Sequence, residues 1–199
     1  MTVLAKALGV ARALKFSSRG LALVEFALLL PIMIALYFGT VEITKAVIAK
    51  RKLNLAVYTL ADLTSQAQGV SQTDLTAIFG SASAVMAPVN VTTLQMRLSS
   101  IIVYPTGKTC VDWSQASGTG ITPLTAGSTT FVMPTVITAT PTADTRDFIV
   151  AETYLAYNPG SHGIIAGTIA LHEGPTYVVP RKSLRVIADT SIQSSSPCS

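Results

Sequence analysis

Residues 17–39 of the chain, SSRGLALVEFALLLPIMIALYFG, decide the fold that the sequence predicts. From residue 21 to residue 41 the run holds one charged side chain, Glu25, and it is as long as the roughly 20 residues that a helix needs to cross a bilayer. A cleaved secretory signal has a shorter apolar region, about 7–15 residues, followed by small side chains. Here the bulky pair Tyr37 and Phe38 closes the run. We therefore expect a retained transmembrane helix over residues 21–41.

The helical pattern continues beyond this run. Small and apolar side chains recur at steps of three and four residues from Ala46 to Thr64, and Gly69 is the first residue that favours a helix end. The pattern predicts one helix over residues 21–68, roughly 70 Å long at 1.5 Å per residue. Its second part would pack on a water-soluble domain. Pro31 lacks an amide proton and its ring crowds the preceding turn, so we expect a kink there.

Charge is concentrated before the apolar run. The chain is 49% apolar and only 12% charged, about half the charged fraction of a typical soluble domain. Four of its 14 basic residues fall in a leader over residues 1–20, at Lys6, Arg12, Lys15 and Arg19. The other ten balance the 10 acidic residues, and no basic patch interleaved with aromatic residues follows the leader. This distribution argues against nucleic acid as a partner.

Basic residues also follow the apolar run, at Lys45, Lys50, Arg51 and Lys52. Basic residues are normally more numerous on the cytoplasmic side of a membrane helix, and here their numbers at the two ends are nearly equal. Charge alone does not fix the orientation of the predicted helix.

Residues 69–199 have the pattern of a small, mainly antiparallel α+β domain. Ser71 and Asp74 resemble a helix N-cap and its third residue, for a short helix through about Val85. Alternating apolar residues near 94–98 predict a half-buried strand, and residues 147–157, apolar on both faces, predict a central strand. Residues 176–188 carry Pro180, which belongs on an edge strand or at a bulge.

The segment between Asp112 and Asp144 has no charged residue, and Ser, Thr, Gly and Pro dominate it. We expect a long loop with a short hairpin near residues 131–137. Residues 114–143 are either a flexible loop or an adhesive surface. Trp113, the sole tryptophan, is expected to anchor the core.

Few groups in the sequence could carry out catalysis. The two histidines, His162 and His172, have no carboxylate or cysteine at ligand spacing, and LHEGP is not an HExxH motif. Asp144 and Asp147 are expected in turns or caps rather than as a catalytic pair. No GxSxG, phosphate-binding loop or GxGxxG motif occurs. We expect neither an enzyme nor a bound cofactor or metal.

The two cysteines, Cys110 and Cys198, stand far apart in the sequence and outside any metal-ligand spacing. They are either free thiols or, if the domain lies in an oxidising compartment, a disulfide that pins the C-terminal tail.

The position of Glu25 within the apolar run needs a physical explanation. A carboxylate in hydrocarbon costs about 2.5–3.5 kcal/mol on insertion scales. A single helix has no bundle interior to shelter it, so Glu25 either lies at the membrane interface or meets a cationic partner. One such partner is the α-amine of a neighbouring copy that has been cut just before Leu21. A residue as small as Gly20 lets a peptidase reach the backbone at that bond.

The basic leader, Gly20 and the residues LALVEF (21–26) resemble the processing site of type IV pilin-like proteins, which have glycine before the cut and glutamate at the fifth mature position. An aromatic residue after the glutamate, here Phe26, resembles the tight-adherence (Tad, or Flp) branch. Other segments resemble the TadE/TadG-like family of minor pseudopilins: LADLTSQ (60–66), CVDWSQA (110–116), IVAETYLAY (149–157), VPRKSLRV (179–186) and the late Cys198. The resemblance spans most of residues 17–198.

This resemblance implies a pilin-like fold held in the inner (cytoplasmic) membrane by a single helix, with the C-terminal domain in the periplasm or, after assembly, in an extracellular pilus. A prepilin peptidase would cut between Gly20 and Leu21. Glu25, next to Phe26, would then pair with the N-terminal amine of an adjacent subunit. The implied partners are the peptidase, other pilin and pseudopilin subunits and the Tad assembly machinery.

The same resemblance permits a disulfide between Cys110 and Cys198. The chain has no space for an added von Willebrand-type domain, which favours the TadE-like side of the family. Two functions remain in competition. The first is a minor pseudopilin that takes part in Tad/Flp pilus assembly, adhesion and biofilm formation. The second is an uncleaved, membrane-tethered periplasmic scaffold or ligand-binding protein.

Overall fold

The computed structural model describes residues 18–138, 144–159, 167–192 and 198, so residues 1–17 of the predicted leader and His162 lie outside the described residues. The chain divides into two compact units. Of the first, which comprises residues 1–45 and 160–166, the structure describes residues 18–45. The second unit holds residues 46–159 and 167–199.

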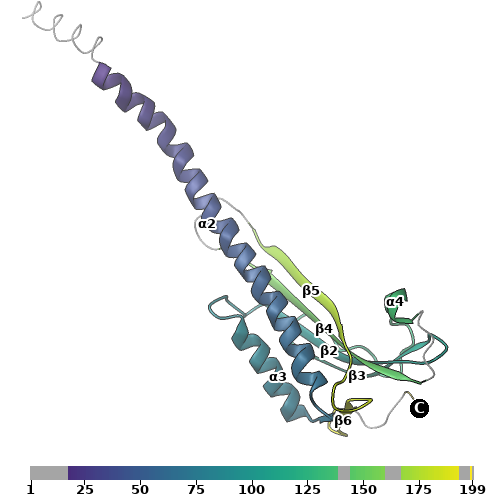
Figure 1. The fold of residues 1–199 in the computed structure, drawn as a ribbon. Coiled ribbons are helices and arrows are strands. Elements are labelled where there is room, and N and C mark those ends of the chain that lie inside the picture. The colour runs from purple at the N-terminus through teal and green to yellow at the C-terminus, as the bar shows by residue number, and fades with distance from the viewer. Residues whose placement is uncertain (1–17, 139–143, 160–166, 193–197, 199) are drawn as a thin grey trace, which may run out of the picture. The chain divides into compact units, whose positions relative to one another are not determined.

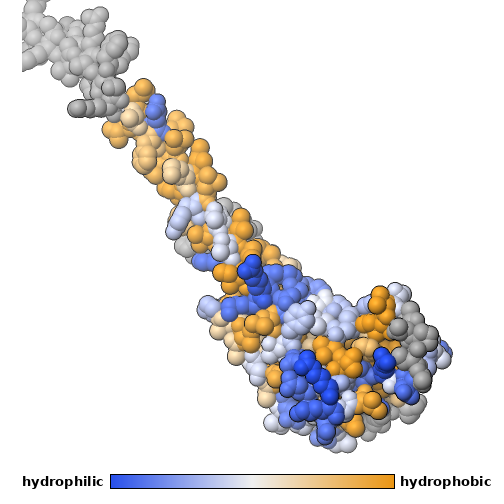
Figure 2. All heavy atoms as spheres, in the orientation of Figure 1, coloured by the Kyte–Doolittle hydropathy of each residue, from blue (hydrophilic) through white to orange (hydrophobic). Residues whose placement is uncertain are grey.

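The first element is the long helix α2, Ser18–Ser65 (Figure 1). In the first unit its apolar side chains are exposed, from Leu21 at 63% to Tyr37 at 66%. Figure 2 shows this part of the helix as an almost continuous hydrophobic surface. The helix is long and apolar enough to cross a membrane, with a mean hydropathy of 2.4 over its most apolar stretch. Pro31 lies inside the helix, and the kink expected there stays a prediction.

The helix ends at Ser65 rather than at residue 68, where the hydrogen bonds to the helix backbone change from four-residue to three-residue steps. Ser65 Oγ donates to the carbonyl oxygen of Asp62 at 2.8 Å, and the Ala67 amide donates to the Thr64 carbonyl at 3.1 Å. The chain then enters the short strand β1, Gly69–Val70.

The second unit contains a four-stranded antiparallel sheet in the order β3-β2-β4-β5. Its strands are β2 (Leu94–Val103), β3 (Thr109–Ser117), β4 (Arg146–Tyr157) and β5 (Ile169–Val178). β4 lies between two neighbours, as its two apolar faces predict. A separate parallel pair joins β1 to β6, Ile187–Ala188. The α+β prediction, with a long N-terminal helix packed on a small antiparallel sheet, is confirmed.

The main core lies between the helices and one face of the sheet. In the second unit, α2 buries Leu53, Val57 and Leu60 completely or nearly so against strand residues such as Leu98 and Ile149. Lys50 adds an ion pair to this packing, with its Nζ 2.8 Å from Glu173 Oε1 on β5. Burial of its apolar stripe is what sets the position of an amphipathic helix on a sheet.

The second helix of this unit, α3 (Gln72–Val85), has the start that the sequence predicts. The Asp74 amide donates to Ser71 Oγ at 3.2 Å, and the Ser71 amide donates to Asp74 Oδ2 at 2.9 Å. This reciprocal pair is a capping box, formed here with Asp in place of the more common Glu or Gln. The hydrogen bonds from Ser71 lower the pKa of the Asp74 carboxyl group.

The expected hairpin near residues 131–137 is wrong. No strand lies in residues 118–138, and residues 135–138 form the short helix α4, Thr135–Thr138. Two causes are visible in the backbone. Residues 127 and 128 bond to Val111 on β3 rather than to a partner strand, and Pro134 has no amide to donate to a ladder. The segment instead places Met133 against Ile101, on the sheet face opposite the main core.

Residues 176–188 do not form one strand. β5 ends at Val178, and β6 begins only at Ile187. Pro180 lies buried just beyond the end of β5, which is an edge strand of the sheet. Proline cannot continue a hydrogen-bonded ladder, so the chain leaves the sheet at this point and returns beside β1.

Candidate functional site

The predicted processing and assembly residues lie together near the start of α2. Gly20, Leu21, Glu25 and Phe26 all have exposed side chains or surfaces in the first unit. Leu21 and Glu25 are four residues apart, so they lie on the same side of the helix, one turn from each other. None of the ion pairs among the described residues involves Glu25. The geometry places the bond before Leu21 within one helical turn of the carboxylate.

The fold does not limit the size of the side chain at residue 20, which is Gly20. A Cβ atom built there would meet nothing within 4 Å. A larger side chain at residue 20 is therefore compatible with the described helix. Any requirement for glycine at this position must come from outside the described residues.

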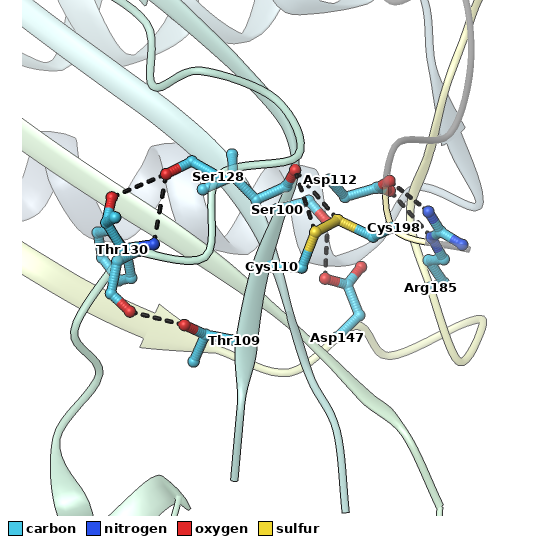
Figure 3. Close-up of a disulfide and its surroundings, with 11 residues drawn as sticks. Ser100, Thr109, Cys110, Asp112, Ser128, Thr130, Asp147, Arg185 and Cys198 are labelled. Atoms are coloured by element: carbon cyan, nitrogen blue, oxygen red, sulfur yellow. Dashed lines mark hydrogen bonds and ion pairs between the residues drawn. A yellow bond between two sulfur atoms is a disulfide. The ribbon is translucent and has the colours of Figure 1, made fainter. Parts of the chain in front are cut away.

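The structure also brings together groups that the sequence separates widely (Figure 3). Cys110 on β3 and Cys198 form a disulfide with a Cα–Cα distance of 6.0 Å. Asp112, Asp147 and Arg185 surround it. Arg185 pairs with both carboxylate oxygens of Asp112, with Nε 2.9 Å from Oδ2. The sequence does not predict this ion pair, because no spacing signal links residues 73 positions apart.

Asp147 is the most perturbed acid of this cluster. It is 3% exposed, and its carboxylate accepts the Ser100 hydroxyl at 2.6 Å and the Val186 amide at 3.0 Å. Burial raises the pKa of the Asp147 carboxyl group to about 6, and the nearby Asp112 charge also raises it. The hydrogen bonds and the Arg185 charge act in the opposite direction. Asp147 therefore holds a main-chain amide in place, in contrast to Asp144, which is exposed.

Trp113 occupies the core, as predicted. Its side chain is 1% exposed, and its indole N–H donates to the Val186 carbonyl oxygen at 2.8 Å. Both backbone polar groups of Val186 are thus hydrogen-bonded to side chains of the sheet. His172 lies within β5 and stacks on Tyr154 at a ring distance of 4.2 Å. Within the described residues, no three His, Cys, Asp or Glu side chains come together as a candidate metal site.

The fold and the exposed apolar helix define a class of protein: an α+β domain whose N-terminal helix can serve as a single-pass membrane anchor. Residues 20–62 match the family model of TadE-like protein, which confirms the predicted resemblance for most of α2. Neither a curated protein nor a solved structure matches the chain. The match and the apolar helix associate the chain with the Tad pilus system. The resemblance of the strand segments lies beyond the matched residues and stays a prediction.

Proposed function

We propose that this chain is a minor pseudopilin of the TadE-like kind, inserted in the inner membrane with its C-terminal domain in the periplasm. It acts through assembly with other pilin and pseudopilin subunits rather than through catalysis, and so takes part in Tad/Flp pilus assembly, adhesion and biofilm formation. The observation that carries the proposal is Glu25, a carboxylate one helical turn from Leu21 on an otherwise uncharged and exposed stretch of α2.

The chemistry of this position follows from a cut between Gly20 and Leu21. A prepilin peptidase would hydrolyse that peptide bond and leave a new α-amine on Leu21. An α-amine has an ordinary pKa of about 7.7–8.0, so most of it carries a positive charge at neutral pH. Pairing this amine with Glu25 of an adjacent subunit brings together two charges that are each costly in hydrocarbon. The pair would fix the register of neighbouring helices.

The first experiment is the intact mass and N-terminal sequence of the protein recovered from its own membranes. A chain that begins at Leu21 supports the proposal. The matched variant is Gly20→Leu, which the described helix accommodates without a contact within 4 Å. It should keep the full-length mass, because the larger side chain blocks the peptidase and not the fold. A wild-type chain that retains its leader while the peptidase is active would contradict processing.

A second variant separates processing from assembly. Glu25→Gln keeps the length of the side chain and removes its charge, so membrane insertion should be maintained. We expect the variant to be missing from sheared pilus fractions while the membrane fraction still contains it. Wild-type amounts of the variant in pili would refute the role of Glu25. An uncut and unassembled wild-type chain would instead favour the membrane-tethered scaffold.

A further inference from the structure

Residues 181–189, here called the C-terminal strap, join the end of α2 to the sheet. On the α2 side, the Arg181 amide donates to the Ser65 carbonyl at 2.8 Å, and its guanidinium lies 2.9 Å from Asp62 Oδ1. Further along, the Asp189 amide donates to the Val70 carbonyl at 2.9 Å. The strap therefore closes the second unit where α2 ends and β1 begins.

On the sheet side, the strap is held by the Val186 side chain, which belongs to the main core, by Ala188, which packs partly buried against that core, and by several polar groups. Trp113 and Asp147 form hydrogen bonds with the two backbone polar groups of Val186, and Asp112 binds Arg185. The strap buries little apolar surface of its own. Val186 is fully buried, but Leu184 is 91% exposed and Ile187 is 64% exposed. Since apolar burial is the main favourable term in such docking, the strap binds weakly for its length.

The polar contacts carry a cost of their own. The charged groups that face Asp147 are Asp112 from β3 and Arg185 from the strap, and Arg185 forms its ion pair with Asp112 near the disulfide. Removing the Asp112 carboxylate from water opposes docking, since its side chain is only 4% exposed, so its ion pair with the partly exposed Arg185 adds little net stability. The strap consequently needs a constraint besides its own contacts.

The disulfide between Cys110 and Cys198 supplies such a constraint. It ties the chain beyond the strap to the strand that carries Asp112 and Trp113. A covalent tether raises the effective concentration of the strap at its docking site without adding a contact. We propose that the C-terminal strap is a redox-controlled clasp, closed while Cys110 and Cys198 are joined and open when they are reduced, so that opening exposes Trp113 and the end of α2 to water.

Closing the clasp by forming the disulfide is a two-electron oxidation. The two thiols lose two electrons and two protons as the S–S bond forms, and a disulfide oxidant of the compartment takes them up and becomes a dithiol. Opening with a phosphine reverses the step: the disulfide takes two electrons from the phosphine, and water supplies the oxygen atom of the phosphine oxide and the protons that return both sulfurs to thiols. The strap would thus close only after the domain reaches an oxidising compartment.

The test uses the full chain in detergent micelles, with Trp113 as its sole tryptophan. After reduction by a phosphine, with both thiols verified by alkylation and mass, we expect the Trp113 emission to shift to longer wavelength. Amide hydrogen exchange in peptides covering the strap should accelerate by on the order of tenfold or more. Exchange in α3 serves as the internal reference and should change little.

The variant Cys198→Ser is the matched control. Without any reductant it should already show the shifted emission and the faster strap exchange, and phosphine should change neither further. Two outcomes would overturn the proposal. One is unchanged emission and exchange in a chain whose thiols are both free. The other is equal acceleration in α3, which would mean general unfolding rather than opening of the strap. The reduction experiment on the wild-type chain tests the proposal even if the variant does not fold.

Discussion

Trp113 on β3 donates its indole N–H to the main-chain carbonyl oxygen of Val186 at 2.8 Å, and both side chains are almost completely buried. The two residues are 73 positions apart in the sequence. Because the Val186 amide also donates to Asp147, the core fixes the position of the C-terminal strap through both backbone polar groups of a single residue. The largest side chain of the core is therefore also an anchor for the last part of the fold.

Trp113→Phe should destabilise the second unit. The variant leaves the Val186 carbonyl without its donor, which costs about 1–3 kcal/mol for a buried polar group. The smaller ring adds a cavity to that cost. Denaturant unfolding of the full chain, followed by circular dichroism, measures the change. Leu184→Ala is the matched control in the strap, where 91% of the residue is exposed, and it should change the free energy of unfolding by less than about 0.5 kcal/mol. Equal effects of the two variants would contradict the anchoring role of Trp113.

Ser71→Ala should weaken α3 by about 0.5–2 kcal/mol, because it removes the N-cap acceptor for the Asp74 amide. Hydrogen exchange of the first turn of α3 measures the loss directly. Ser81→Ala in the same helix is the control. Its hydroxyl only donates back to the Ala77 carbonyl at 2.8 Å, and alanine has the higher helix propensity. Exchange that is equally fast in both variants would show that the capping box does not stabilise the helix.

Local sequence signals predict much of this fold. The long apolar run, the Ser71–Asp74 cap and the two apolar faces of residues 147–157 each depend on neighbouring residues, and each corresponds to an observed element. The end of α2 and the shape of residues 118–138 depend on distant partners. The Val111 backbone forms hydrogen bonds with the backbone of residues 127 and 128, and no local sequence pattern predicts such a contact.

The candidate sites divide in the same way. Gly20, Leu21 and Glu25 form a short motif that can be found in the sequence and that α2 keeps on one stretch of helix. The cluster of Asp112, Asp147 and Arg185 comes together only because β3, β4 and the strap meet beside the disulfide. Asp147 gives one local clue, since a carboxylate at the start of a strand that is apolar on both faces is well placed to be buried.

Gly118→Ala should destabilise the second unit. Gly118 has φ +99°, and a Cβ atom there would lie 2.3 Å from the Leu94 carbonyl oxygen. Backbone strain of this kind costs on the order of 1–3 kcal/mol. Gly80→Ala is the matched control, because a Cβ atom in that part of α3 would meet nothing within 4 Å. Removing a glycine from a helix interior should stabilise the chain by about 0.5–1 kcal/mol. Thermal unfolding shows whether each variant is less or more stable than the wild-type chain. If both variants were destabilised, the predicted difference between Gly118 and Gly80 would be contradicted.

Asp147→Asn should change the pH dependence of stability. The folded-state pKa of about 6 lies above the ordinary value of 3.8 for an aspartate, so the folded chain binds this proton more tightly than the unfolded chain. The contribution of Asp147 is therefore fully present below pH 3.8 and is lost as the pH rises through about 6. A shift of this size corresponds to on the order of 3 kcal/mol.

An asparagine does not titrate, yet its amide can accept the Val186 N–H and donate to the Ser100 hydroxyl. Relative to the wild-type chain, Asp147→Asn should therefore gain stability between about pH 4 and about pH 6 and show a constant difference above that range. Denaturant unfolding at a series of pH values measures this difference. Ser100→Ala removes a hydrogen bond that lowers the pKa of Asp147, so in that variant the loss of stability should extend to higher pH. A difference between wild type and Asp147→Asn that stays constant from about pH 4 upward would mean that the proton on Asp147 is not linked to folding.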